Sequence, residues 1–234
     1  MTYAMGRRGG EIMRLRQTIA FLGAMLVLST GGCTTPPVCQ MYVVPIGAFP
    51  ETMTKDLIRH YDQTLQLHIR PLPTLPVTAD MVDSVRKQLI GEEVIRKMKE
   101  QWPALATDPN VRLFGLTGED MFIRSKQWYF AFALREEGRF ALVSTHRMDP
   151  TFFKLPPNEN VMGTRLRKML TKQIGLHYYG LLDRTEKTSV LFSPILGLDD
   201  LDAVASEFDA VDRERIAQLP RPCPMPSQPT RLVR

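Results

Sequence analysis

Residues 165–183 read Arg-Leu-Arg-Lys-Met-Leu-Thr-Lys-Gln-Ile-Gly-Leu-His-Tyr-Tyr-Gly-Leu-Leu-Asp, and this stretch decides how the rest of the chain is interpreted. Four apolar side chains and one histidine recur at helical spacing: Leu166, Met169, Leu170, Ile174 and His177. This pattern predicts one helix with a core-facing side. Gly180 is the type of residue that ends such a helix, because glycine adopts a positive φ without strain. The other side is basic and, as charged helix sides usually are, is expected to be solvated; it carries Arg165, Arg167, Lys168 and Lys172.

Segments with strand and helix character alternate around this stretch. Strands are predicted at residues 41–47, 67–70, 111–116, 128–134 and 140–146, and helices at 49–66, 80–98 with an interruption at Gly91, 198–208 and 212–219. The strands at 128–134 and 140–146 flank a tight turn and are expected to form a hairpin. The fold class that follows is α/β, an α+β sandwich with a mixed sheet and helices beside it, over residues 41–219.

The composition of the chain is that of an ordinary globular protein, with 234 residues, 44% hydrophobic and 24% charged. The formal net charge of +5 is concentrated at the start, where residues 1–32 carry four Arg and one Glu. The remainder has 26 basic and 24 acidic side chains. It shows no basic patch interleaved with aromatic residues, so nucleic acid is not an expected partner.

The first 33 residues have the pattern of a secretory signal peptide. Four arginines precede the apolar run at residues 19–28, which is too short for an ordinary membrane-spanning helix, and small residues lead to Cys33. The end of this segment resembles a bacterial lipobox, which implies that Cys33 is lipidated and that the protein is anchored in the cell envelope, facing the periplasm or the exterior. Thr30 stands where such motifs usually have Leu, and secretion with cleavage near Gly31–Gly32 is the alternative. Residues 34–40 are then a tether and residues 220–234 a Pro-rich, disordered tail.

Two further cysteines lie near the two ends of the mature chain. In an oxidising compartment Cys39 and Cys223 can form a disulfide that closes a long loop and contributes about 4–5 kcal/mol. The alternative is two free thiols, and the sequence leaves both possibilities open.

The order of several short motifs resembles the archaemetzincins, a family of metzincin-like zinc peptidases. The matching segments are Val44–Gly47, Arg86–Gln88, Phe114–Ile123, Trp128–Ala133 and Ala141–Met148. The resemblance implies a twisted mixed sheet, a long central helix under a cleft and short C-terminal helices. It also implies that the strand at Trp128–Leu134 is an edge strand, which could bind an extended peptide or an envelope protein by β-addition.

The central helix has the frame of the metzincin active-site pattern H-E-x-x-H-x-x-G-x-x-H, aligned on Gly180. The first zinc-ligand position then holds Gln173, the catalytic carboxylate position Ile174, the second ligand position His177 and the third Asp183. An amide oxygen is a poor zinc ligand beside imidazole, and Ile174 cannot take a proton from a metal-bound water. His177 and Asp183 are the remnant metal-ligand candidates.

A second family feature is also missing, since the four-cysteine structural zinc site has Arg184 where one cysteine is expected, and Cys223 alone cannot rebuild it. The resemblance therefore implies a degenerate branch without peptidase activity or metal, which acts by binding. The alternative is a zinc metallopeptidase with an atypical ligand set, His177 and Asp183 with Gln173 or His146, and Glu119 as the base. In the plainest interpretation, His177 is only a buried histidine, hydrogen-bonded to the sheet or to Asp183, in a lipoprotein that serves as a spacer.

Overall fold

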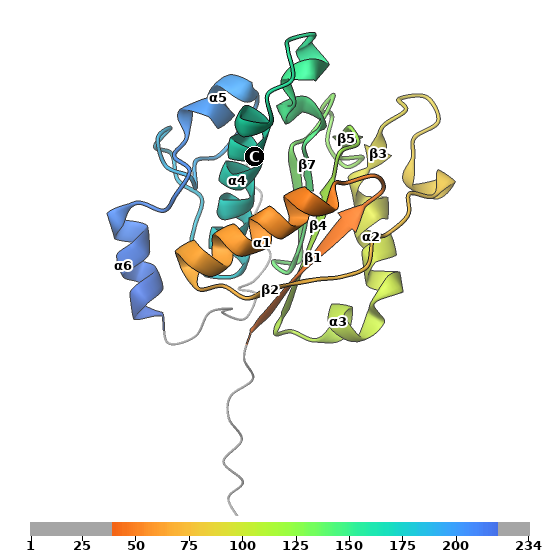
Figure 1. Cartoon of the computed structure of the whole chain (residues 1–234). Coiled ribbons are helices and arrows are strands. Elements are labelled where there is room, and N and C mark those ends of the chain that lie inside the picture. The colour runs from red at the N-terminus through yellow and green to blue at the C-terminus, as the bar shows by residue number, and fades with distance from the viewer. Residues whose placement is uncertain (1–38, 220–234) are drawn as a thin grey trace, which may run out of the picture. The chain divides into compact units, whose positions relative to one another are not determined.

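A five-stranded mixed sheet forms the centre of the part of the chain that the computed structural model describes, residues 39–219 (Figure 1). Its strands are β1 (Gln40–Ile46), β2 (Ile69–Pro71), β4 (Val111–Thr117), β6 (Ala133–Glu136) and β7 (Phe140–Ser144). They lie in the order β2-β1-β4-β7-β6, in which the first four are parallel and β6 runs antiparallel to β7 at the edge. The predicted fold class, a mixed sheet with a long helix beside it, is confirmed.

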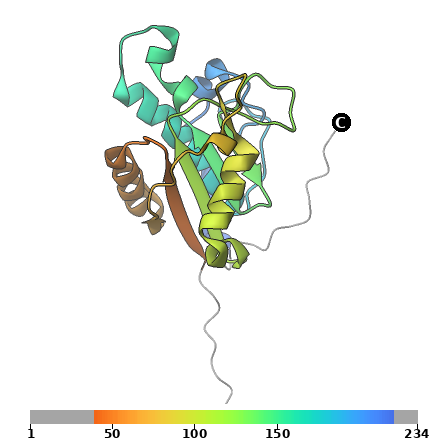
Figure 2. The same ribbon diagram turned by 90° about the vertical axis from the view of Figure 1, so that its right-hand side faces the viewer.

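Alternation along the strands divides the core into two layers, since successive side chains of a strand point to opposite faces. In β1, Met41 and Val43 pack on one side, and Val44 and Ile46 on the other. The first side is covered by α1 (Glu51–Leu65) and α4 (Glu159–His177), and the second by α2 (Gly91–Gln101) (Figure 2). β4 and β7 are therefore buried on both faces, and β1 is buried on both faces from Val43 onward, as expected for strands rich in apolar residues.

The central helix α4 contains residues 165–177 of the stretch quoted above, and residues 178–183 follow its end. It begins after Asn158, whose side chain accepts a hydrogen bond from the Val161 N–H at 3.1 Å and caps the first turn. It ends at His177, and Gly180 follows with φ 64°, so the predicted turn at this glycine is present. Three shorter helices complete the described part: α3 (Pro103–Thr107), α5 (Leu198–Ala203) and α6 (Ala210–Gln218). No helix among residues 39–219 combines the length and the apolar character needed to cross a membrane.

The helix predicted over residues 80–98 is wrong in its first half. Asp83 accepts hydrogen bonds from the N–H groups of Val85 and Arg86, and Lys87 has φ 57°, so this segment is a turn. A short strand β3 (Leu89–Ile90) follows and pairs in parallel with β5 (Met121–Phe122). Gly91 starts α2 rather than interrupting a longer helix. The apolar residues within 82–90 have a spacing close to that of a helix, which is why the sequence predicts a helix there. The local hydrogen bonds of Asp83 favour a turn instead and override that pattern.

The predicted edge strand at Trp128–Leu134 is also corrected. The hairpin with β7 exists, but β6 covers only Ala133–Glu136, and the aromatic segment before it, residues 128–132, is not part of a strand. Its backbone is held by separate contacts, because Arg86 and Gln88 donate side-chain hydrogen bonds to the carbonyl groups of Trp128 and Tyr129.

Several predictions concern residues that the structure does not describe. The signal peptide, Cys33, residues 34–38 of the tether, the C-terminal tail and Cys223 all lie outside residues 39–219. Cys39, at the start of β1, is buried and disulfide-bonded. Its pairing with Cys223 stays a prediction.

Candidate functional site

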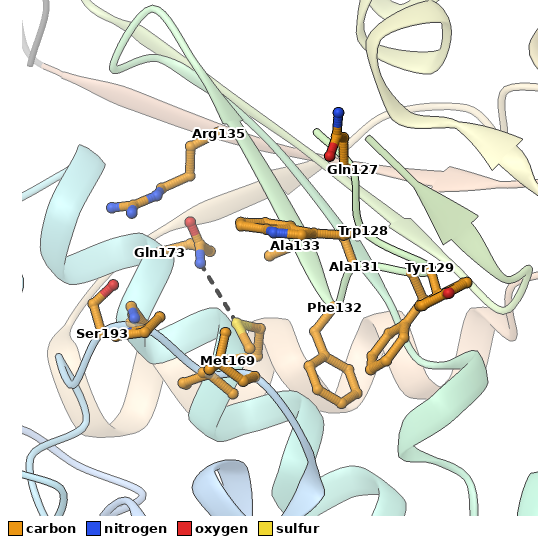
Figure 3. Close-up of a pocket in the computed structure, with 15 residues that line it drawn as sticks. Gln127, Trp128, Tyr129, Ala131, Phe132, Ala133, Arg135, Met169, Gln173 and Ser193 are labelled. Atoms are coloured by element: carbon orange, nitrogen blue, oxygen red, sulfur yellow. Dashed lines mark hydrogen bonds between the residues drawn. The ribbon is translucent and has the colours of Figure 1, made fainter. Parts of the chain in front are cut away.

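A pocket of about 320 Å³ lies between the edge of the sheet and the central helix (Figure 3). One wall is the extended segment that precedes β6 together with β6 itself, residues 127–133 and Arg135. The opposite wall is α4, with Met169, Lys172 and Gln173, and residues 193–196 close the rim. The pocket is thus where the resemblance placed a substrate cleft, beside the active-site helix and along the edge strand.

Gln173, at the first zinc-ligand position, is the one of the four aligned residues that lines this pocket. Its side chain is buried, with 2% of the residue exposed, and its Oε1 has no hydrogen-bond partner in the described part of the chain. Its Nε2 has only a weak contact with Met169 Sδ at 3.6 Å (Figure 3). A buried amide oxygen without a hydrogen-bond partner is costly to the folded state, so Gln173 is a strained position in this wall of the pocket.

Ile174 and His177 point away from the pocket and into the core. Ile174 is fully buried in the layer between α4 and the sheet. The His177 ring, 5% exposed, packs edge-on against Phe114 of β4 with ring centroids 5.6 Å apart. Neither ring nitrogen has a hydrogen-bond partner among the described residues, so the predicted hydrogen bond to the sheet or to Asp183 is not formed.

Burial lowers the pKa of His177 to about 4, because the imidazolium would lose its hydration. The backbone of Gly138 partly opposes this shift, without a well-aligned hydrogen bond to the ring. Two arginines, Arg135 and Arg112, lower the pKa further, and Asp183 acts weakly in the opposite sense. His177 is therefore a neutral histidine of the core at any pH near 7.

Asp183, at the third zinc-ligand position, is held by two cations. Its Oδ2 accepts hydrogen bonds from two guanidinium nitrogens of Arg135, at 3.3 and 3.2 Å. Its Oδ1 lies 3.5 Å from the Nζ of Lys172, whose side chain is 5% exposed. A carboxylate that already neutralises an arginine and a buried lysine is a poor candidate for a metal ligand, because a cation at this place would compete with both.

The burial of Lys172 was missed by the sequence analysis, which expected the basic side of the helix to be solvated. Lys172 donates a hydrogen bond to the Phe192 carbonyl, and Lys168, one turn earlier, donates to the carbonyls of Leu201 and Asp202. Burial lowers the pKa of Lys172 to about 8, with Asp183 opposing the shift. The loop after α4 folds over this side of the helix, and no local pattern in residues 165–183 indicates that it does.

The remaining candidates for an atypical metal site are not brought together. His146 lies beyond the end of β7, with Nδ1 3.1 Å from the Gly118 carbonyl, and does not line the pocket. Glu119 is exposed in the turn after β4. Among residues 39–219, no three His, Cys, Asp or Glu side chains are grouped closely enough to hold one metal ion. The donor set at the aligned positions (an amide, an isoleucine, a buried imidazole and a paired carboxylate) does not fit a catalytic zinc ion.

An ion pair is formed at the position where the resemblance predicts a cysteine of a structural zinc site. Arg184, at the expected cysteine position, pairs with Asp212 at the start of α6, and the Asp212 side chain is completely buried. The Arg184 backbone also bonds to Leu191 and Ser193, so this residue ties the loop after α4 to α6.

No protein-family model matches the chain, but comparison with curated proteins and solved structures gives a consistent result. It is 27% identical over 150 residues to an archaemetzincin of Thermococcus kodakarensis, covering 59% of this chain and 75% of the relative. An archaemetzincin of Pyrococcus furiosus is 26% identical over 150 residues, covering 61% and 74%. The chain is related to the archaemetzincins.

The solved structures agree with this relation at the level of the fold. A zinc-dependent peptidase from Methanocorpusculum labreanum superposes with a TM-score of 0.63 at 17% identity, covering 75% of this chain and 99% of that one. The archaemetzincin of Archaeoglobus fulgidus, solved with malonate, gives a TM-score of 0.59 at 18% identity with the same coverage. The archaemetzincin-like fold is therefore shown. The residues at the aligned zinc positions differ from the metzincin pattern, as described above.

Proposed function

We propose that this chain is a lipid-anchored protein of the bacterial cell envelope that uses an archaemetzincin-like cleft to bind an extended peptide or protein segment, without hydrolysing it. The observation that carries the proposal is the charge of the cleft. Lys172 and Arg135 surround Asp183 where the aligned third zinc ligand stands, and Gln173 and Ile174 supply neither an imidazole nor a base.

The open edge of the sheet supports binding by β-addition. The Ser144 N–H donates to the Phe132 carbonyl at 2.9 Å, and Leu134 lies opposite Leu142. Because bonded and non-bonded pairs alternate in an antiparallel ladder, Ala133 and Arg135 direct their N–H and C=O groups away from β7. Both line the pocket, so a peptide at this edge would pair with β6 and place every second side chain over the cleft.

The envelope location rests on the sequence before the described part. A basic start, an apolar run at residues 19–28 and small residues before Cys33 are typical of a lipidated precursor. The disulfide at Cys39 agrees with an oxidising compartment.

The first test is the metal content of the protein, purified without chelators and without a histidine tag. We expect a folded protein with far less than one zinc per chain and no chelator-sensitive hydrolysis of a peptide library. About one zinc per chain that is lost in His177→Ala would instead support the alternative, a zinc metallopeptidase with His177 and Asp183 as ligands. Location is tested separately by mass spectrometry of the mature N-terminus, where a diacylated Cys33 is expected.

A further inference from the structure

The pocket beside β6 has two chemically different parts. One part is polar and contains Lys172, Arg135 and the unpaired amide of Gln173. The other is an aromatic and aliphatic surface made by Trp128, Phe130, Phe132, Met169 and Leu196. Figure 3 shows the side chains of Arg135, Gln173 and Trp128 near one another at the pocket.

The polar part has an excess of positive charge and of hydrogen-bond donors. Two cations face the single carboxylate of Asp183. The ammonium group of Lys172 has three donors, of which the Phe192 carbonyl and Asp183 account for two, and Arg135 uses two of its five on Asp183. The amide of Gln173 can turn either its NH₂ or its oxygen toward the cavity, since the two ends are nearly isosteric. Such a group of donors is complementary to a carboxylate.

Phe132 and Met169 form the buried base of the apolar part, and its outer members are exposed. Trp128 is 48% exposed, the neighbouring Tyr129 85% and Leu196 67%. The guanidinium of Arg147 stacks over Phe130 at 4.3 Å and fixes the inner end of this surface. Aromatic surface of this kind, next to charged groups that are already in place, is typical of a site that binds through apolar anchors.

We propose that the pocket binds an extended acidic peptide whose backbone pairs with β6. A Glu or Asp side chain of the peptide enters between Lys172 and Arg135, and an apolar side chain two residues away packs against Trp128. The spacing follows from strand geometry, because side chains at positions i and i+2 of an extended chain point to the same face. This inference rests on the proposed function and adds the chemical class of the ligand.

Charge complementarity also separates this ligand from segments of the chain itself. The tail at residues 220–234 contains three arginines and no acidic side chain, and residues 34–38 contain no charge at all. Neither segment supplies an acidic side chain for the polar part of the pocket. The occupant is therefore a segment of another protein.

The experiment measures fluorescence anisotropy of labelled peptides with the full-length protein. The peptides are acetylated and amidated, alternate small polar and apolar residues, and carry Glu, Gln or Lys at the central inward position. We expect the Glu peptide to bind roughly 10- to 100-fold more tightly than the Gln peptide, as for a charge-assisted hydrogen bond to a partly buried cation, and the Lys peptide to bind most weakly.

Two lysine variants then locate the effect. Lys172→Met should remove the preference for the Glu peptide over the Gln peptide. Lys168→Met is the matched control, because this buried lysine lies on the same helix, donates to the carbonyls of Leu201 and Asp202 and does not line the pocket. It should keep the preference. If Lys172→Met does not fold, the three peptides on the unmodified protein still decide the question.

The other outcomes each overturn a defined part of the reasoning. Equal binding of the Glu and Gln peptides, weakened by Trp128→Ala, would overturn the acidic ligand and keep the peptide-binding function. No binding of any peptide would overturn both. A neutral peptide with a free carboxyl terminus that binds as tightly as the capped Glu peptide would assign the carboxylate to a chain end. Self-association that is abolished by Trp128→Ala, measured by sedimentation, would make a second copy the occupant.

Discussion

Replacing His177 by leucine should change how the stability of this protein depends on pH. The imidazole is buried against Phe114, has no hydrogen-bond partner in the described part of the chain and has its pKa lowered from 6.5 to about 4. The charged groups that face it are Arg112 of β4, Arg135 of β6 and Asp183, and the two arginines act in the same direction as burial. In the unfolded chain the same imidazole takes up a proton near pH 6.5.

The sign and the magnitude follow from linkage. Above pH 6.5 neither state is protonated at His177, so the residue does not affect the free energy of unfolding. As the pH falls from 6.5 to about 4, the unfolded state binds a proton that the native state excludes, and stability is lost. A pKa that falls from 6.5 to about 4 corresponds to about 3 kcal/mol, since each pKa unit is worth 1.36 kcal/mol. Below pH 4 the loss is complete.

The assay is urea unfolding of the wild type and of His177→Leu at several pH values between 7.5 and 3.5. Other carboxyl groups destabilise both proteins in acid, so the informative quantity is the difference in free energy of unfolding between them. We expect the variant to be as stable as the wild type or more stable at pH 7.5, and to gain about 3 kcal/mol relative to it by pH 4. Phe114→Leu is the control, because it disturbs the same ring contact and keeps the imidazole. Parallel pH profiles of wild type and His177→Leu would show that the ring is hydrated or metal-bound, and the argument would fail.

Three further predictions concern the frame around the pocket. Asp212→Ala should lower the free energy of unfolding by about 3–5 kcal/mol, because it leaves the partly buried guanidinium of Arg184 without its partner, and Arg184→Met combined with Asp212→Leu should recover much of this loss in urea unfolding. Gly175→Ala should lower the melting temperature through overpacking worth about 1–3 kcal/mol, because its Cβ would lie 2.8 Å from Leu191 and Phe208 atoms, whereas Gly163→Ala, which meets only an Arg167 nitrogen at 3.4 Å, should not. Reduction of the disulfide at Cys39 should lower the free energy of unfolding by about 4–5 kcal/mol, measured as a shift of the urea midpoint with dithiothreitol.

The sequence predicted those elements whose neighbours along the chain determine them. β1 and β4 are rich in apolar residues because both of their faces are covered, and α4 shows its core side as a 3.6-residue repeat. Gly180 has the positive φ that its place after the helix required. A pocket also lies beside α4 and the edge of the sheet, the place where the family resemblance predicts a cleft.

The sequence did not predict features that depend on distant segments. The turn at residues 82–88 is set by Asp83 and by the bonds of Gln88 to Asp120 and Tyr129, which come together only in the folded chain. Lys172 is on a helix side whose composition indicates solvent, and it is buried because residues 184–196 fold over it. The burial of Lys172 matters more for function, because it determines the charge of the pocket.

The sign of that charge separates the two functions considered for this cleft. A zinc ion bound to Asp183 would lie within about 5 Å of the Arg135 guanidinium, and a dication at that distance is repelled by about 6–7 kcal/mol at an effective dielectric constant of 20. A carboxylate about 4 Å from the same guanidinium is attracted by about 4 kcal/mol under the same conditions. Lys172 can lose its proton cheaply because its pKa is about 8, but an arginine cannot, so Arg135 is the group that a metal ion at Asp183 would have to displace. Zinc chemistry at this place would therefore require changes at Gln173, Ile174 and Arg135 together, whereas an acidic peptide would meet a pocket whose charge is complementary to it.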